Sequence, residues 1–184
     1  KKNIRIFVNY QRNSSIVTKK ILYDIENDKI KPPFNVTHWY SDGLENSCSH
    51  FIALFNQLFG KVKTIGKVQR NILNKKTDFF LNYKDAQVFF SELEYPYAFN
   101  GFKMFCQNGV LEYLNNGIDI KWNNLIYTKI KYPKKQIVSN QNKFYNNDFF
   151  QSQMSFTDQL YKSLINEKSV ISSDKDAIYV RRIL

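Results

Sequence analysis

The sequence predicts an α+β domain in which helices cover one face of a large, mostly antiparallel open sheet. Two observations carry this prediction. Short extended segments follow one another through the middle of the chain, and Asn-Gly pairs at 108–109 and 116–117 are typical of tight turns between antiparallel strands. Apolar residues at helical spacing lie on both sides of this region. Because 43% of the 184 residues are hydrophobic, we expect one domain over residues 1–184.

The N-terminal part predicts a strand, a helix and a second strand. Residues 4–8 have an extended pattern, and Asn13 and Ser14 are suitable caps for the helix that follows. From 34 to 40 apolar and polar side chains alternate, which is typical of a half-buried strand. His38 lies on the alternating face, so a structural role is expected for it.

The next helix is predicted over residues 47–59, with Ser47 as its cap and Gly60 just past its end. His50, one of two histidines in the chain, then lies in the first turn. Backbone N–H groups and the helix dipole disfavour an imidazolium there, so we expect a neutral ring that can accept a proton from a bound hydroxyl. Asn46, four residues earlier, could reach the same group. A purely structural histidine is the open alternative.

A run of antiparallel strands is predicted after this helix. The predicted strands are rich in Phe and Tyr. If helices cover one face of the sheet, the aromatic residues on the other face also need a cover. We therefore expect a homo-oligomer, in the simplest case a homodimer, through the open face of the sheet. The extended segments are 62–69, 78–83, 86–93, 99–106, 110–114, 118–122 and 125–131.

The C-terminal part returns to a helical pattern from about Asn142. A stripe of apolar residues at helical spacing is expected to pack in the core. Ser173 and Asp174 then begin a last short helix. The stripe consists of Phe149, Phe150, Met154, Phe156, Leu160 and Leu164.

The composition limits the partners of this chain. The net charge of +11 comes from 27 basic and 16 acidic side chains, but the lysines are scattered and form no recognised nucleic-acid motif. We therefore do not expect nucleic acid as a partner.

No apolar run approaches the roughly 20 residues that cross a bilayer, and no signal peptide opens the sequence, so a cytoplasmic protein without membrane contact is expected. Cys48 and Cys106 lack metal-ligand spacing, which predicts free thiols and no metal site.

The six glycines never fall at the spacing of a phosphate-binding loop, so no dinucleotide fold is expected within these residues.

Three blocks of the sequence, 8–15, 39–60 and 98–113, resemble in this order the C-terminal domain of the Gfo/Idh/MocA oxidoreductases, which are the glucose-fructose oxidoreductase and inositol dehydrogenase family. In that family a Rossmann domain comes first and binds NAD or NADP. The C-terminal α+β domain, with its large open sheet, supplies the substrate pocket and the oligomer interface.

The resemblance implies an NAD(P)-dependent oxidoreductase that acts on a sugar, nucleotide sugar or cyclic polyol, in surface polysaccharide biosynthesis. It also implies that these 184 residues alone bind no cofactor and are inactive, because the nucleotide-binding domain is not among them. Two other functions stay open. One is a non-catalytic dimerisation module, and the other is a module that binds nucleic acid or another acidic ligand.

Five residues acquire roles from the resemblance. His50 matches the catalytic histidine and would act as the general base, while Asn46 stands where an acid is frequent and would orient the hydroxyl. Arg12 would bind a substrate carboxylate or phosphate, and Tyr10 or Tyr40 would line the pocket. A salt bridge for Arg12, and core or rim packing for the two tyrosines, are the open alternatives.

Overall fold

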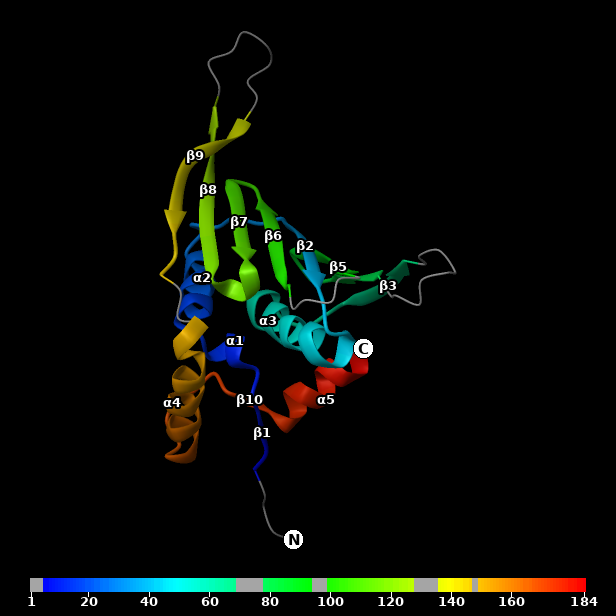
Figure 1. The fold of residues 1–184 in the computed structure, drawn as a ribbon, viewed down its shortest axis with the longest axis vertical. Coiled ribbons are helices and arrows are strands. Elements are labelled where there is room, and N and C mark those ends of the chain that lie inside the picture. Colours follow the sequence, from blue (N-terminus) through cyan, green and yellow to red (C-terminus); the bar gives the residue numbers. More distant parts are fainter. Residues whose placement is uncertain (1–4, 69–77, 94–98, 128–135, 147–148) are drawn as a thin grey trace.

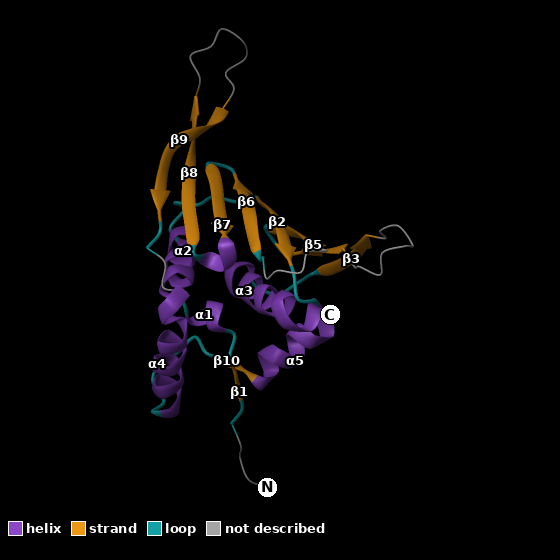
Figure 2. Cartoon of the chain, viewed as in Figure 1, coloured by secondary structure: helices purple, strands orange, loops and turns teal. Residues whose placement is uncertain are grey.

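Two layers make up the fold: a sheet of eight strands, and helices that cover one of its faces (Figures 1 and 2). The computed structural model describes residues 5–68, 78–93, 99–127, 136–146 and 149–184. The strand order is β3-β4-β5-β2-β6-β7-β8-β9, and the neighbouring strands are antiparallel except for the parallel pair of β2 and β5. The predicted α+β class with a mostly antiparallel sheet is therefore confirmed.

Two short strands, β1 and β10, pair with each other, so that residues near the N-terminus lie beside the start of α5. Within the described residues, no helix has the length and apolar character needed to cross a bilayer. The strands are β1 (Phe7–Val8), β2 (Phe34–Tyr40), β3 (Thr64–Val68), β4 (Asp78–Asn82), β5 (Ala86–Glu92), β6 (Gly101–Cys106), β7 (Gly109–Leu114), β8 (Asp119–Tyr127), β9 (Gln136–Phe144) and β10 (Ser172–Ser173). The helices are α1 (Gln11–Ser14), α2 (Ile16–Glu26), α3 (Ser49–Phe59), α4 (Ser152–Leu164) and α5 (Asp174–Ile183).

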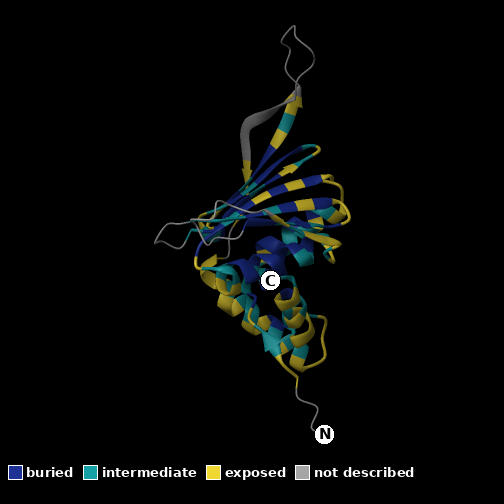
Figure 3. Cartoon of the chain, turned by 90° about the vertical axis from the view of Figure 1, so that its right-hand side faces the viewer, coloured by how far each residue is buried: buried dark blue, intermediate teal, exposed yellow. Residues whose placement is uncertain are grey.

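The core lies between α3 and the inner face of the sheet. Strands alternate buried and exposed residues, as Figure 3 shows, and β2 does so along its whole length. Seven of the eleven residues of α3 are buried, so this helix is enclosed on most sides. Phe55 packs edge-on against Phe102 of β6 at a centroid distance of 5.2 Å, and Phe79 stacks on Phe90 at 4.5 Å. Aromatic packing therefore fixes α3 against the centre of the sheet.

A turn forms at both predicted places, but the first consists of Gln107 and Asn108, because Gly109 is already the first residue of β7. Cys106 pairs with Gly109, so a two-residue turn joins β6 to β7. Between β7 and β8, Asn116 and Gly117 adopt positive φ values of 61° and 101°. Asparagine and glycine are the residues that tolerate this left-handed region at least cost.

Several element boundaries differ from the prediction. Ser15, rather than Asn13 or Ser14, caps α2, because residues 11–14 form the separate turn α1. The segments predicted at 118–122 and 125–131 form a single strand, β8, as far as Tyr127. An irregularity in the pairing with β9 between Asn123 and Leu125 breaks the alternation there. Strand β9 was not predicted, since its polar sequence at the edge of the sheet lacks a period of two.

The apolar stripe predicted between Phe149 and Leu164, most of which lies on α4, is not core, which corrects the prediction. The exposed fractions are 83% for Phe150, 74% for Met154 and 50% for Leu164. This helix lies beside α1, outside the area covered by the sheet, as Figure 1 shows. Helical spacing of apolar residues identifies a face correctly but does not show what the face packs against.

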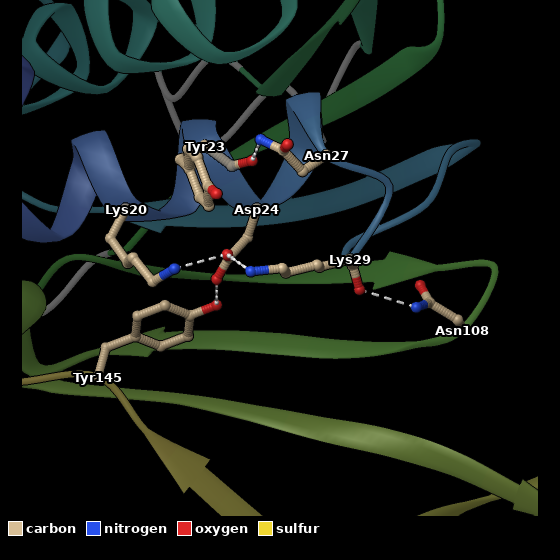
Figure 4. Close-up of polar contacts among 7 residues, drawn as sticks. All are labelled: Lys20, Tyr23, Asp24, Asn27, Lys29, Asn108 and Tyr145. Atoms are coloured by element: carbon tan, nitrogen blue, oxygen red, sulfur yellow. Dashed lines mark hydrogen bonds and ion pairs between the residues drawn. The ribbon is translucent and has the colours of Figure 1, made fainter.

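A buried carboxylate connects α2 to the end of β9 (Figure 4). Asp24 is 2% exposed, and it accepts hydrogen bonds from Lys20 Nζ at 2.8 Å and from the Tyr145 hydroxyl at 3.0 Å. Lys29 Nζ lies 3.6 Å from the same carboxylate. Burial alone raises the pKa of Asp24, but the hydrogen bonds from Lys20 and Tyr145 outweigh it and hold the pKa below its usual value.

Replacing this carboxylate is expected to destabilise the fold. In Asp24→Ala the hydroxyl of Tyr145, a residue that is 9% exposed, loses its acceptor, which costs about 1–3 kcal/mol of unfolding free energy. Urea denaturation followed by circular dichroism measures the change. Asp158→Ala is the matched control, because Asp158 pairs with Lys162 on the solvent side of α4, and its loss should destabilise the fold less than the loss of Asp24. Equal effects of the two substitutions would contradict a structural role for the Asp24 cluster.

Candidate active site

The chain leaves β2 through a left-handed turn before it enters the helical segment that carries His50. Asp42 and Gly43 have positive φ values of 65° and 79°. A π-helical turn, η1 (Leu44–Cys48), then leads into α3. Ser47 therefore lies inside a helical turn and does not cap the helix, which corrects the prediction. Single π-helical turns of this kind are frequent at functional sites.

His50 is the second residue of α3 and is partly buried. Its ring meets the ring of Tyr10 edge-on, with a centroid distance of 5.2 Å. Burial, and then the positive charge of Arg12, lower the pKa of His50 to about 4. The lowered pKa agrees with the predicted neutral ring, but its causes are burial and the Arg12 charge rather than the helix dipole, since the π-helical turn η1 precedes α3.

Arg12 lies on α1 and is held against α3. Its guanidinium carbon is 4.4 Å from the centroid of the Phe51 ring, within the range of a cation–π contact. No acidic side chain forms an ion pair with Arg12 among the residues that the structure describes. The described part of the chain therefore does not show the salt bridge that was the alternative role of Arg12. Its Nε atom is buried without a hydrogen-bond partner.

The two tyrosines predicted for the pocket differ in position. Tyr10 precedes α1 and packs on His50, and burial followed by the charge of Asp176 raises the pKa of Tyr10. Tyr40 is fully buried at the end of β2 and lies 5.8 Å, between ring centroids, from His38. Tyr40 packs in the core, as the open alternative has it, because it belongs to the inward face of β2, which the helices cover, and its role in a pocket stays a prediction.

Asn46 lies in the π-helical turn, and its side chain is exposed. Its backbone carbonyl accepts a hydrogen bond from the Ser49 hydroxyl at 2.8 Å. In the described part of the chain no hydrogen bond joins the Asn46 side chain to His50, so its orienting role stays a prediction.

His38 is the second histidine near Arg12, and its predicted structural role is confirmed. It is fully buried, and its ring centroid lies 4.1 Å from that of Phe51. Its Nδ1 atom is 2.8 Å from the carbonyl oxygen of Gly101. Burial lowers the pKa of His38 to about 3, with the Arg12 charge acting in the same direction and the Gly101 bond against it. The ring is therefore neutral, with Nδ1 as the donor.

Two cavities flank α1, and no sequence pattern indicated either of them. A small cavity of about 40 Å³ is lined by Gln11, Arg12, Ser15 and Ser152, among others. A larger cavity of about 350 Å³ lies between α1, α3 and α5. Its lining includes Ala53, one turn after His50 on the same face of α3. Because cavities form between elements that are distant in sequence, local patterns do not reveal them.

Two kinds of cofactor motif matter among the described residues: a phosphate-binding loop and a cluster of metal ligands. None of the described glycines stands in a phosphate-binding loop with the G-x-G-x-x-G spacing. No group of three or more His, Cys, Asp or Glu side chains is placed to hold a metal ion, within the residues that are described. Of the predicted site residues, Tyr10 contacts His50, and Arg12 acts on the pKa of His50; these three form the candidate site.

Comparison with solved structures shows which known proteins share this fold. No family model matches the sequence, and a search of curated proteins also finds no match. The fold is similar to that of UDP-N-acetylglucosamine 3-dehydrogenase GnnA from Acidithiobacillus ferrooxidans, with a TM-score of 0.63, 8% identity, and coverage of 97% of this chain and 59% of that one. The fold is also similar to that of an inositol dehydrogenase homolog from Azotobacter vinelandii, complexed with NADH and myo-inositol. The TM-score is 0.62 at 9% identity, and the match covers 98% of this chain and 61% of that one.

A third similar structure is a super-repressor mutant of Gal80p from Saccharomyces cerevisiae, with a TM-score of 0.68, 10% identity, and coverage of 98% of this chain and 62% of that one. The chain thus spans about 60% of the length of each. It has the fold of Gfo/Idh/MocA-type oxidoreductases, as the resemblance in sequence implied. Since this fold also occurs in a repressor, the site rather than the fold must support a catalytic function.

Proposed function

We propose that this chain is the substrate-binding domain of an NAD(P)-dependent oxidoreductase that acts on a sugar, nucleotide sugar or cyclic polyol, in surface polysaccharide biosynthesis. The observation that carries the proposal is the neutral His50, partly buried between Tyr10 and the charge of Arg12. Oxidation of an alcohol needs a group that removes the hydroxyl proton, and a neutral imidazole at the edge of a site has that property. The dehydrogenases of similar fold support the proposal.

In this proposal a nicotinamide bound by residues beyond those described here supplies the hydride acceptor. The chain's own residues hold the substrate and move its proton. Because Nδ1 of His50 is buried without a partner, Nε2 is the nitrogen that can take the hydroxyl proton. Tyr10 fixes the plane of the imidazole by its edge-on contact, and Asn46 orients the hydroxyl from the π-helical turn.

Turnover by the full-length protein tests this function. We expect reduction of NAD⁺ or NADP⁺, followed by absorbance, with at least one member of a panel of monosaccharides, nucleotide sugars and inositols. A protein that binds a panel member but reduces neither cofactor would favour the non-catalytic alternative. Steep loss of affinity for nucleic acid with added salt would instead favour an acidic-ligand module.

The open face of the sheet is the second part of the proposal, as the interface of a homodimer. Glu112 lies between Lys103 at 3.0 Å and Lys121 at 2.7 Å, so a row of paired charges crosses this face. Phe105, one strand from Glu112, points to the same side and is 48% exposed. In the proposed interface Phe105 is the apolar contact at the centre, and the charged row belongs to its polar rim.

Substitution of Phe105 is expected to weaken this dimer. Phe105→Asp places a charge in the apolar part of the interface, and we expect the dissociation constant to rise at least about tenfold. Light scattering over a dilution series measures it. Tyr23→Asp, at a residue that is 50% exposed on α2, serves as the control and should leave the mass unchanged. A monomer at every concentration would contradict the proposed interface.

A further inference from the structure

Helix α4 has its apolar side on the outside of the molecule. Met154 is 74% exposed, Tyr161 63% and Leu164 50%. Phe150, in the turn η3 (Phe149–Gln151) that leads into the helix, is 83% exposed. The apolar face of a surface helix ordinarily turns toward the core. An apolar face that is directed outward therefore indicates a surface that another molecule covers.

Polar contacts attach the other side of α4 to the rest of the chain. The Ser152 hydroxyl donates to Gln11 Oε1 at 3.2 Å, which joins the start of α4 to α1. One side-chain oxygen of the buried Gln159 accepts a hydrogen bond from the backbone N–H of Val170 at 3.1 Å. Because these contacts orient the helix, its apolar side is presented in one fixed direction.

The exposed residues have the spacing by which one helix pairs with another. From Phe150 the steps along the chain are four, three, four and three residues, which lead to Met154, Thr157, Tyr161 and Leu164. Alternating steps of four and three are those of the a and d positions of a heptad, whose side chains pack between the side chains of a facing helix. We name these five residues the α4 seam. Its narrow, regular form indicates that the partner also presents a helix.

The α4 seam is symmetric about Thr157, its middle member. When a second copy of α4 lies antiparallel across this residue, Met154 of each copy faces Tyr161 of the other, a favourable contact between sulfur and an aromatic ring. The small side chain of Thr157 then lies on the two-fold axis. Its hydroxyl donates to the carbonyl oxygen of Gln153 at 2.9 Å, so burial of this residue leaves no unpaired hydroxyl.

Charge is compatible with this pairing. Asp158, next to the axis, is paired with Lys162 of its own chain at 2.7 Å, so each copy brings its own counterion. Antiparallel helices also place opposite ends of their dipoles side by side.

The area of the α4 seam is at the lower limit of a specific interface. Phe150 and Tyr161 together expose about 300 Å² in each copy. With Met154, Leu164 and the adjacent Ile165, which is 46% exposed, pairing of two copies buries on the order of 1,000 Å². We therefore expect a reversible association that depends on protein concentration.

We propose that α4 is an interface between two copies of this chain, in which the two helices pack antiparallel with Thr157 on the two-fold axis. This interface is separate from the open face of the sheet, because α4 lies beside α1, outside the area covered by the sheet (Figure 1). It does not depend on the proposed function. A chain with two separate two-fold interfaces forms an assembly larger than a dimer, in the simplest closed arrangement a tetramer.

A single cysteine on the axis tests both the pairing and its direction. In Thr157→Cys the two new thiols meet across the axis, and oxidised glutathione should convert most of the protein to a disulfide-linked dimer on a non-reducing gel. Leu164→Cys is the matched control. In an antiparallel pair its two copies lie about 20 Å apart, too far for a disulfide bond. The unmodified protein, in which Cys48 is buried and Cys106 partly buried, gives the background.

A second experiment measures the association without a disulfide. In Phe105→Asp, where the proposed sheet interface is weakened, sedimentation velocity over a dilution series should still show self-association through α4. Adding Tyr161→Asp places a charge in the α4 seam and should raise the dissociation constant at least about tenfold. Adding Tyr23→Asp instead should leave it unchanged. Circular dichroism should be the same for all three proteins, since residues 23 and 161 are both exposed.

Several results would overturn the inference. They are absence of a linked dimer in Thr157→Cys, equal linking of Thr157→Cys and Leu164→Cys, and a Phe105→Asp protein that is monomeric at every concentration. Linking of the 184-residue chain but not of the full-length protein would also do so, because another part of the same polypeptide would then cover α4. None of these outcomes bears on the oxidoreductase proposal, which is tested by turnover.

Discussion

Replacing His50 with glutamine in the full-length protein is expected to lower kcat/KM by about 10²–10⁴-fold, the usual contribution of a positioned general base. Glutamine is close to histidine in size and remains polar, so the partly buried site beside Tyr10 stays filled. The pH profile provides a second measurement. Because the pKa of His50 is about 4, its neutral form dominates from pH 5 upward, and this group should cause no loss of kcat/KM between pH 5 and 8.

The midpoint of thermal unfolding shows whether His50→Gln lowers activity without destabilising the fold. It should remain within a few degrees of that of the unmodified protein, since the ring makes no hydrogen bond among the described residues. Retention of full kcat/KM in His50→Gln, with the fold intact, would remove His50 from the reaction. A fall in kcat/KM that follows a pKa near 6.5 would show that the ring is not held as the structure describes.

Acid is expected to unfold this protein through His38. The pKa of this histidine is about 3 in the folded chain and near 6.5 in the unfolded chain, so the unfolded state binds the proton first. The stabilising contribution of the neutral ring is therefore complete above pH 6.5 and is lost as the pH falls toward 3. At pH 4.5, two units below the unfolded value, the loss from this group alone is about 3 kcal/mol. Guanidinium denaturation at a series of pH values measures it.

His38→Gln separates this effect from other acid-sensitive groups. An amide can still donate to the Gly101 carbonyl but does not titrate, so the loss between pH 6.5 and 4.5 should shrink although the variant is less stable at pH 7. His50 acts in the same direction, and the lowered pKa of Asp24 adds a further loss below its usual range. An unfolding free energy that stays constant from pH 7 to 4.5 would contradict a neutral buried His38.

The elements that could be predicted are those whose sequence pattern and packing agree. The alternation from 34 to 40 predicted β2 with its full length, and Ser173 predicted the start of α5, where a capping box with Asp176 forms. The errors have tertiary causes. The stripe on α4 has helical spacing but no sheet beneath it, and β9 is an edge strand whose polar residues carry no alternation.

The site was predictable in part. Helical position identified His50, and a neutral ring followed from a dipole argument, whereas burial and Arg12 are the physical causes. The contacts of Tyr10 with His50 and of Arg12 with Phe51 join segments about 40 residues apart, so local periodicity does not contain them. The burial of Tyr40 could not be decided from the sequence, because the sequence shows that a strand alternates but not which side the helices cover.

The parallel pairing at the centre of the sheet has a consequence for the order of folding. Strand β2 is inserted between β5 and β6, whose residues come from about 50 to 70 positions later in the chain. A growing polypeptide therefore exposes β2 and the apolar helix α3 before their partners have been synthesised. The meander from β6 to β8, joined by short turns, requires only local contacts and can form early. Closure of the sheet around β2 is thus the late step, and until then the chain is most exposed to aggregation.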